Sequence, residues 1–235
     1  MPSNQEWRGC FAQLEKIIDQ PINAAQQLQL QSYVGLLLKW NKTYNLIGPS
    51  TVSSILDRHI EDSAPLLPLL SHALPSSPHA LLNIADIGSG AGFPGLVLAL
   101  LSPPGMRFDL IESAGKKARF LQYVVNNLSL ADNCSVFNQR AEQHQMHHKD
   151  EYHFVVSRAV GTLSLLAQLA QPLLIPGGSV LALKGERSEE EIEAFLSTPF
   201  SGSFETPKLL PVESIPGATI IRLRKVSRGT LSEQT

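Results

Sequence analysis

A glycine-rich turn constrains this chain more than any other feature of its 235 residues. Residues 83–95 read NIADIGSGAGFPG, so an apolar stretch ending at Ile87 is followed by three alternating glycines, Gly88, Gly90 and Gly92. Glycine takes positive φ and has no Cβ, which lets the backbone bend sharply between a strand and a helix and approach a ligand closely. The segment therefore predicts an α/β fold that binds a nucleotide-like ligand at this turn.

The spacing of the glycines separates the possible cofactors. A dinucleotide fingerprint would have its third glycine where this chain has Phe93, and the Gly-Lys-Ser/Thr ending of a phosphate-binding loop is absent. Glu112 lies 20 residues beyond Gly92, at the end of an apolar stretch, where a carboxylate can accept hydrogen bonds from ribose hydroxyls. The remaining interpretation is a pocket for S-adenosylmethionine. Asp86 either holds the turn by accepting backbone N–H bonds, which we favour, or steers the cofactor by its charge.

Composition is that of an ordinary globular protein, with 43% hydrophobic and 17% charged residues. The net charge of −2 argues against a general nucleic-acid coat but leaves room for a local basic face. Cys10 and Cys134 are too few and too far apart for a disulfide framework or a zinc knuckle, which favours a reducing cytoplasm. The N-terminus lacks the apolar region of a secretory signal, and the uncharged stretches 66–85 and 163–183 are too interrupted to span a membrane.

Helical periodicity comes first in the chain, and strand–helix alternation follows it. Apolar residues recur at helical spacing over 11–40 with a break at Pro21, and a third helix is expected over about 51–70. We divide the chain into an N-terminal helical cap and linker (1–78), a main α/β domain (79–228) and a flexible tail (229–235). Strands are expected at 82–87, 108–111, 135–138, 154–157, 179–183, 208–212 and 219–226, and helices at 94–101, 116–128, 163–174 and 189–196. This alternation indicates a mostly parallel sheet that binds ligands beyond the carboxyl ends of its strands, where Glu112, Arg158 and Lys184 fall.

Further motifs extend along nearly the whole chain. They are KWNK (39–42), YNL (44–46), RHI (58–60), DS (62–63), the glycine-rich turn, ES (112–113), GKK (115–117), RFL (119–121), RAE (140–142), SRA (157–159) and KG (184–185). In order and spacing, these motifs resemble the RsmG (GidB) family of bacterial methyltransferases, which act on guanine N7 in 16S ribosomal RNA. Many relatives have aspartate where this chain has Glu112, a longer carboxylate that can still reach a ribose.

The resemblance implies a class I methyltransferase with a Rossmann-like, seven-stranded, mostly parallel sheet and S-adenosyl-L-methionine as its cofactor. It implies that Gly88 and Phe93 line the cofactor, that Ala141 and Glu142 flank the adenine, and that Arg158 meets the methionine end. These roles suit the chemistry, because a carboxylate accepts from an adenine amino group and a guanidinium binds a carboxylate bidentately. The whole predicted cofactor site is Asp86, Gly88, Gly90, Gly92, Phe93, Glu112, Ala141, Glu142 and Arg158. The structural alternatives are a solvated acid at a helix start for Glu142, a surface ion pair for Arg158 and a core side chain for Phe93.

Basic residues predict where the 16S rRNA or small ribosomal subunit binds. Lys116, Lys117 and Arg119 begin the helix after Glu112, close to the expected cofactor mouth. Arg58 and His59 lie about one helical turn from Asp62 and can border the same cleft. We predict that Arg58, His59, Lys116, Lys117 and Arg119 bind RNA, with a buried polar cluster joining cap and main domain as the alternative for Arg58, His59 and Asp62. The patch is expected to extend to Lys39, Lys42, Arg187, Arg222, Arg224, Lys225 and Arg228.

The expected reaction needs no general base, because guanine N7 has an in-plane lone pair and no proton to lose. We therefore assign Arg158 and Lys184 as catalytic residues only in the sense that they position guanine or phosphate. His144, His147 and His148 lack partners that complete a metal-ligand set and are expected in an exposed polar loop. The chain is expected to act as a monomer without a stable protein partner. The alternatives are a class I methyltransferase acting on a protein or small molecule, and a non-catalytic RNA-binding or assembly module that keeps the cofactor fold.

Overall fold

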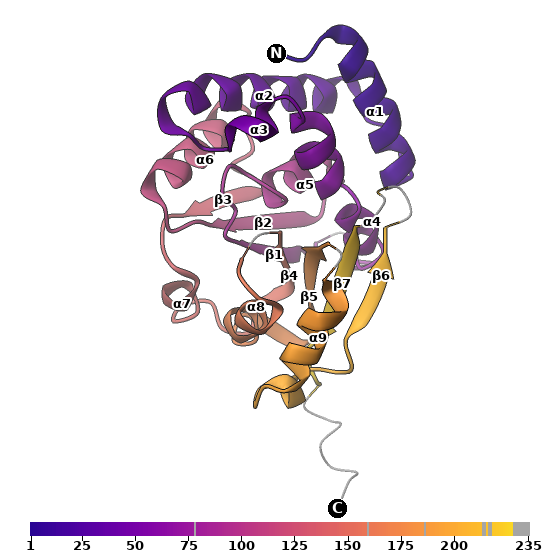
Figure 1. Ribbon diagram of the computed structural model, residues 1–235, viewed down its shortest axis with the longest axis vertical. Helices are drawn as coiled ribbons and strands as arrows, with labels where there is room; N and C mark the ends of the chain where they lie inside the picture. Colours follow the sequence, from indigo (N-terminus) through magenta and orange to yellow (C-terminus); the bar gives the residue numbers. More distant parts are fainter. Residues whose placement is uncertain (78, 159, 186, 213–214, 216–217, 228–235) are drawn as a thin grey trace, which may run out of the picture.

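A seven-stranded sheet separates two groups of helices in the computed structural model, which describes residues 1–77, 79–158, 160–185, 187–212, 215 and 218–227 (Figure 1). The strands are β1 (Leu82–Ile87), β2 (Met106–Ile111), β3 (Cys134–Phe137), β4 (Tyr152–Ser157), β5 (Leu174–Lys184), β6 (Lys208–Pro211) and β7 (Thr219–Arg224). Their order is β3-β2-β1-β4-β5-β7-β6, and β7 alone runs opposite to the other strands of the sheet. The expected seven-stranded, mostly parallel sheet is confirmed.

The N-terminal cap consists of helices that lie over one face of the sheet (Figure 1). They are α1 (Asn4–Ile18), α2 (Ala24–Tyr44), α3 (Pro49–Val52), the π-helix η1 (Leu56–Glu61) and α4 (Leu66–Ser71). Capping boxes at Ser3 and Asn23 define the starts of α1 and α2. The single helix expected over 51–70 is wrong: three short helices replace it, partly because Pro65 has no N–H to continue the ladder from η1 into α4.

The remaining helices alternate with the strands as expected. They are α5 (Gly95–Leu101), α6 (Gly115–Asn127), α7 (Ala141–His144), α8 (Leu163–Ala170) and α9 (Ser188–Leu196), with a 3-10 turn, η2, at Ser201–Ser203. Helix α7 was not expected, and α8 ends at Ala170 because β5 already begins at Leu174. No helix among the described residues is long and apolar enough to cross a membrane.

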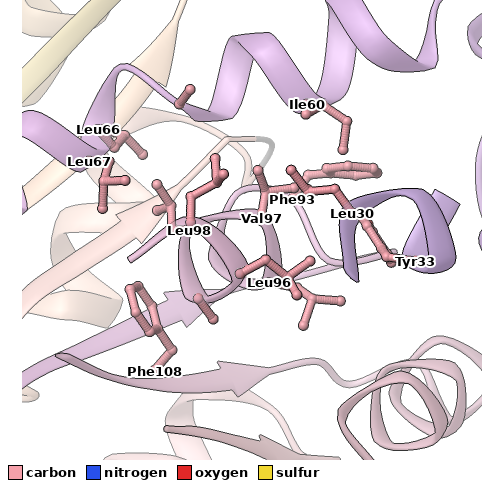
Figure 2. Packing of buried hydrophobic residues seen from close by; sticks show 14 of the residues in the cluster. Leu30, Tyr33, Ile60, Leu66, Leu67, Phe93, Leu96, Val97, Leu98 and Phe108 are labelled. Carbon is pink, nitrogen blue, oxygen red and sulfur yellow. The ribbon is translucent and has the colours of Figure 1, made fainter. Parts of the chain in front are cut away.

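Alternate residues of β1 face two different cores, as the period of two in a strand requires. Leu82 and Ile84 pack with the cap helices and α5, whereas Ala85 and Ile87 pack with α8 and the far side of the sheet. Figure 2 shows the first core, where Leu30 and Tyr33 of α2 and Ile60 of η1 lie near Phe93, Leu96 and Val97 at the start of α5. One continuous core therefore joins the cap to the sheet, and the glycine-rich turn is held between them.

Candidate active site

The glycine-rich turn joins β1 to α5, and its three alternating glycines have φ of 71°, 59° and 114°. A Cβ on Gly88 would overlap Val160 Cγ2, and one on Gly92 would lie 2.9 Å from both Leu96 Cβ and the Tyr33 hydroxyl oxygen. A Cβ on Gly90 would meet nothing closer than the Gly88 carbonyl oxygen, at 3.8 Å. A Cβ therefore meets close neighbours at Gly88 and Gly92, whereas Gly90 has room for one.

Two carboxylates hold this turn. Asp86 is fully buried, and its Oδ2 accepts a hydrogen bond from the Gly95 N–H at 3.0 Å, which confirms the favoured role of Asp86. Burial raises the pKa of Asp86 to about 7. Glu112, also buried, accepts from the N–H groups of Gly90 (2.8 Å) and Ala114 (2.7 Å). Because a carboxylate has about four acceptor positions, Glu112 retains lone pairs for a ligand hydroxyl.

Tyr33 contacts the glycine-rich turn, and sequence reasoning missed this contact. It lies in α2, where its position at helical spacing indicated only a core residue. The side chain is fully buried, and its hydroxyl donates to the Ala91 carbonyl oxygen at 2.8 Å, across 58 positions of sequence. A buried tyrosine needs a partner for its hydroxyl, but nothing in the sequence says where in the fold that partner lies.

A cavity of about 190 Å³ lies at the carboxyl ends of β1, β2 and β3. It is lined by three predicted cofactor residues, Gly88, Ala141 and Glu142, and its apolar walls include Ile87 and Ile111. Ala141 and Glu142 form the first turn of α7, and the Glu142 side chain is exposed. Apolar walls with a carboxylate at the rim suit a flat, partly polar ring such as a nucleobase.

A second cavity, of about 500 Å³, brings together four predicted catalytic and RNA-binding residues. Its walls include Arg58, His59, Arg158 and Lys184, with Asp62 beside them. Arg58 and His59 belong to η1, whereas Arg158 follows β4 and Lys184 ends β5. The cap therefore closes over the carboxyl edge of the sheet at this point.

Arg158 joins the cap to the main domain. Its Nη1 donates to the Arg58 carbonyl oxygen at 2.7 Å, and its Nη2 donates to His59 Nδ1. The guanidinium also lies 5.4 Å from the centre of the Phe93 ring, on which His59 stacks at 4.5 Å between centroids. Arg58 and His59 thus border a cleft, as predicted, and they also form the alternative arrangement, a polar cluster that joins the cap to the main domain.

His59 is neutral at physiological pH in this arrangement. Its side chain is buried, and burial, reinforced by the Arg158 charge, lowers its pKa to about 4. Because Nδ1 accepts from Arg158, the ring proton lies on Nε2. Phe93 is itself buried between His59 and Tyr33, so its ring is a core side chain at the edge of the site.

Lys184 has a structural partner. Its Nζ forms a 2.8 Å ion pair with Glu191 of α9 and donates to the Gly161 carbonyl oxygen at 3.1 Å. The same Glu191 oxygen accepts from the N–H of Leu163, the first residue of α8. The lysine charge is therefore already balanced, and its contacts tie β5 to the starts of two helices.

The basic patch is confined to one side of the molecule. Lys116 and Arg119 of α6 are exposed and Lys117 is half-buried, as expected near the carboxyl end of β2. The expected extension to β7 is wrong, because β7 lies near the opposite edge of the sheet from β3, on which α6 packs. There Arg224 pairs with Glu205 at 3.0 Å and Lys225 with Asp150 at 2.6 Å. Arg222 also lies on β7, Arg187 immediately precedes α9, and Arg228 lies outside the described residues.

The expected exposed histidine loop is wrong for His144, which is fully buried. Its Nε2 is 2.7 Å from the Tyr152 hydroxyl oxygen, which donates to Asp109 Oδ2 at 2.7 Å, and its Nδ1 is 2.8 Å from Gln139 Nε2. His148 stacks on His144 at 4.1 Å, while His147 is exposed. The loop folds back because α7 places His144 against Tyr152 of β4. No group of residues in the described part of the chain is suited to hold a metal ion.

The burial of His144 makes stability depend on pH. Burial, followed by the neighbouring His148 and His147, lowers the pKa of His144 to about 4. Because the unfolded side chain binds its proton near pH 6.5, stability from this residue is complete above that pH and is lost as pH falls towards 4. We expect the loss of stability over this interval, measured by urea unfolding, to be smaller in His144→Gln by up to about 3 kcal/mol. An equal pH dependence in both proteins would assign the acid sensitivity elsewhere.

Comparison with known proteins identifies the family. The family model "GidB: rRNA small subunit methyltransferase G" matches residues 26–211. Ribosomal RNA small subunit methyltransferase G of Halorhodospira halophila is 40% identical over 70% of this chain and 72% of the relative, and that of Paramagnetospirillum magneticum is 36% identical over 86% and 89%. A methyltransferase structure from Geobacter sulfurreducens aligns with a TM-score of 0.58 at 12% identity, over 82% of this chain and 90% of that one, and shares the fold. The chain therefore belongs to the rRNA small subunit methyltransferase G family and is a class I methyltransferase.

Proposed function

We propose that this chain transfers a methyl group from S-adenosyl-L-methionine to N7 of a guanine in the 16S rRNA of the small ribosomal subunit. Family membership supports rRNA as the substrate. The observation that carries the site-level proposal is that two cavities adjoin the end of β4, one lined by Val160 and the other by Arg158. The smaller cavity is the donor site, and the larger one receives the guanine. We also propose that the protein works as a cytoplasmic monomer, where its two free cysteines stay reduced.

The residues of the donor site fit the cofactor. Glu112 accepts hydrogen bonds from the ribose hydroxyls with the lone pairs that Gly90 and Ala114 leave available. Ala141 lies against the adenine, and Glu142 accepts from its amino group. At about 190 Å³ the cavity is smaller than a typical whole-ligand site but has room for a nucleobase, so the methionine end extends towards Arg158.

Arg158 and Lys184 act by positioning. When bound, S-adenosylmethionine supplies an electrophilic methyl group on its sulfonium. Arg158 has five N–H donors in a fixed fork and uses two bonds to hold Arg58 and His59, so further donors remain for a carboxylate. Lys184 sets the wall of the guanine site through its ion pair with Glu191. RNA phosphates contact Arg58, Lys116, Lys117 and Arg119, with His59 at the cleft edge.

The role of Glu112 predicts a loss of cofactor affinity in Glu112→Gln. The amide has one acceptor oxygen in place of two, so it cannot accept from Gly90, Ala114 and both ribose hydroxyls together. We expect S-adenosylhomocysteine to bind about 10 to 100 times more weakly by calorimetry, since hydrogen bonds to a charged group contribute about 1.5–3 kcal/mol. Glu112→Asp keeps the charge and is the matched control. Binding by Glu112→Gln as tight as that of the unaltered protein would remove Glu112 from the ribose site.

The proposed reaction is tested with labelled S-adenosylmethionine and small ribosomal subunits that lack the modification. We expect label at one guanine, mapped by chemical cleavage specific for N7-methylguanine. Label on a ribosomal protein or on a small molecule instead would favour the alternative acceptors. If the protein binds the cofactor but transfers no label, a non-catalytic RNA-binding or assembly module would be favoured.

A further inference from the structure

Helices α2 and α6 lie side by side on one face of the molecule (Figure 1) and contain no acidic residue. Over their 21 and 13 residues they carry five cations, Lys39, Lys42, Lys116, Lys117 and Arg119. None of the five forms an ion pair with a described acidic residue. The whole chain has 21 acidic residues, so their absence from both helices makes this face locally positive despite the net charge of −2.

Two exposed tyrosine rings and one half-buried tryptophan ring lie among these cations. Trp40 and Tyr44 come from the end of α2, and Tyr123 comes from α6. The Trp40 ring is 5.3 Å from that of Tyr44 and 5.2 Å from that of Tyr123, with Phe120 packed at 5.6 Å. Tyr44 is 42% exposed and Tyr123 40%, and neither hydroxyl has a hydrogen-bond partner among the described residues. We call Trp40, Tyr44 and Tyr123 the aromatic platform.

The platform is close to the methyl-transfer site. Tyr33 of α2 bonds to Ala91 in the glycine-rich turn, and Trp40 follows seven residues later, about 10 Å along the helix. On the other helix, Lys116 is four residues beyond Glu112 and Tyr123 is two turns further on. An RNA strand that leaves the guanine cavity along these helices would meet both the cations and the rings.

We infer that the aromatic platform stacks unpaired bases of the RNA segment next to the target guanine, while Lys39, Lys42, Lys116 and Arg119 contact its phosphates. The inference rests on the proposed RNA substrate and adds how that RNA is held. Single-stranded nucleic acid alternates flat bases with anionic phosphates, which matches exposed rings set among unpaired cations. An acidic peptide would satisfy the cations but would leave the row of rings without a function.

The binding test uses a fluorescent single-stranded oligoribonucleotide at several KCl concentrations. A Tyr44→Leu, Tyr123→Leu double variant keeps apolar bulk but loses both rings, and we expect it to bind about tenfold or more weakly with an unchanged salt slope. Tyr44→Phe with Tyr123→Phe restores most of the affinity, because stacking uses the ring and not the hydroxyl. Lys42→Gln with Lys116→Gln lowers the salt slope, by roughly 0.7 for each phosphate that is no longer neutralised. Leu28→Ala, 63% exposed on the same helix, is the matched control and binds normally.

A spectroscopic test reports stacking directly. Trp7 and Trp40 are the two tryptophans of the chain, and Trp7 is buried in α1, so Trp7→Phe leaves Trp40 as the single reporter. We expect bound RNA to quench Trp40 fluorescence at the concentrations at which it binds. Saturating RNA without quenching, or unchanged RNA affinity in the leucine variant, overturns the platform. If the leucine variant binds RNA normally but binds whole ribosomal subunits more weakly, the surface contacts a ribosomal protein. This result would also overturn the aromatic platform. These readouts involve no methyl transfer, so failure of wild-type methylation rejects the proposed function separately.

Discussion

Gly95→Ala is expected to destabilise the fold severely, by about 3–5 kcal/mol. A Cβ at this position would lie 2.5 Å from Asp86 Oδ2 and 2.6 Å from Leu110 Cδ2, and both neighbours are fully buried. The backbone must shift to relieve these contacts, which breaks the 3.0 Å hydrogen bond from the Gly95 N–H to Asp86. The buried carboxyl group then loses its backbone partner, and an unsatisfied buried polar group costs about 1–3 kcal/mol in addition to the overpacking. Urea unfolding measures the loss.

Gly90→Ala, five residues earlier, is the matched control. Its Cβ would have no neighbour closer than 3.8 Å, so the expected loss of stability is only the cost of placing alanine at a φ of 59°, about 1–2 kcal/mol. Because the Gly90 N–H donates to Glu112, the proposed ribose ligand, the larger effect is expected on binding of S-adenosylhomocysteine. If Gly90→Ala destabilises the protein as much as Gly95→Ala does, packing and ligand access are not divided between the two glycines in this way.

The contrast between these glycines shows what sequence can predict here. The turn, its strand and its helix follow from local pattern, because apolar alternation and glycine spacing act over a few residues. Which glycine serves packing depends on what lies opposite it. Gly88 faces Val160, and Gly92 faces Tyr33 as well as the nearby Leu96, so two of these three neighbours are distant in sequence. The motif therefore predicts where the site lies, but the role of each glycine depends on tertiary contacts that the motif does not contain.

The same reasoning explains the misplaced histidine and the misplaced basic residues. His144 is followed by polar and basic residues, which indicates an exposed loop, yet α7 places it against Tyr152 and Asp109. Lys225 resembles Lys116 in type, but it directly follows β7, which the sheet order puts beside β5 and β6 rather than near α6. The burial of a side chain, and the elements that lie next to it across a sheet, depend on contacts between residues distant in sequence. They are set by strand order, whereas the family resemblance implied only the number of strands and their mostly parallel direction.

Arg158→Gln is expected to lower kcat/KM for methyl transfer by at least about 100-fold, because loss of about 1 Å of positional accuracy can cost that much in a reaction that depends on alignment. The guanidinium contacts Arg58, His59 and Phe93 together, so its removal loosens the cap over the guanine cavity as well as the proposed methionine end. Arg158→Lys is not expected to restore activity, since an ammonium lacks the planar fork that serves two partners and a carboxylate. Arg107→Gln, which alters a half-exposed arginine near the start of β2, is the control and should remain active.

Two ligands distinguish a loss of carboxylate binding by Arg158 from a loosening of the cap. S-adenosylhomocysteine carries the amino-acid carboxylate that Arg158 is proposed to bind, whereas methylthioadenosine has the same adenosine and no carboxylate. If Arg158 binds that group, Arg158→Gln weakens S-adenosylhomocysteine by about tenfold or more and leaves methylthioadenosine within about twofold. Equal losses for both ligands would mean that the arginine acts only by joining η1 to β4. The cap would then control the site through the position of His59 and Phe93, and the partner of the methionine carboxylate would have to lie elsewhere along the carboxyl edge of the sheet.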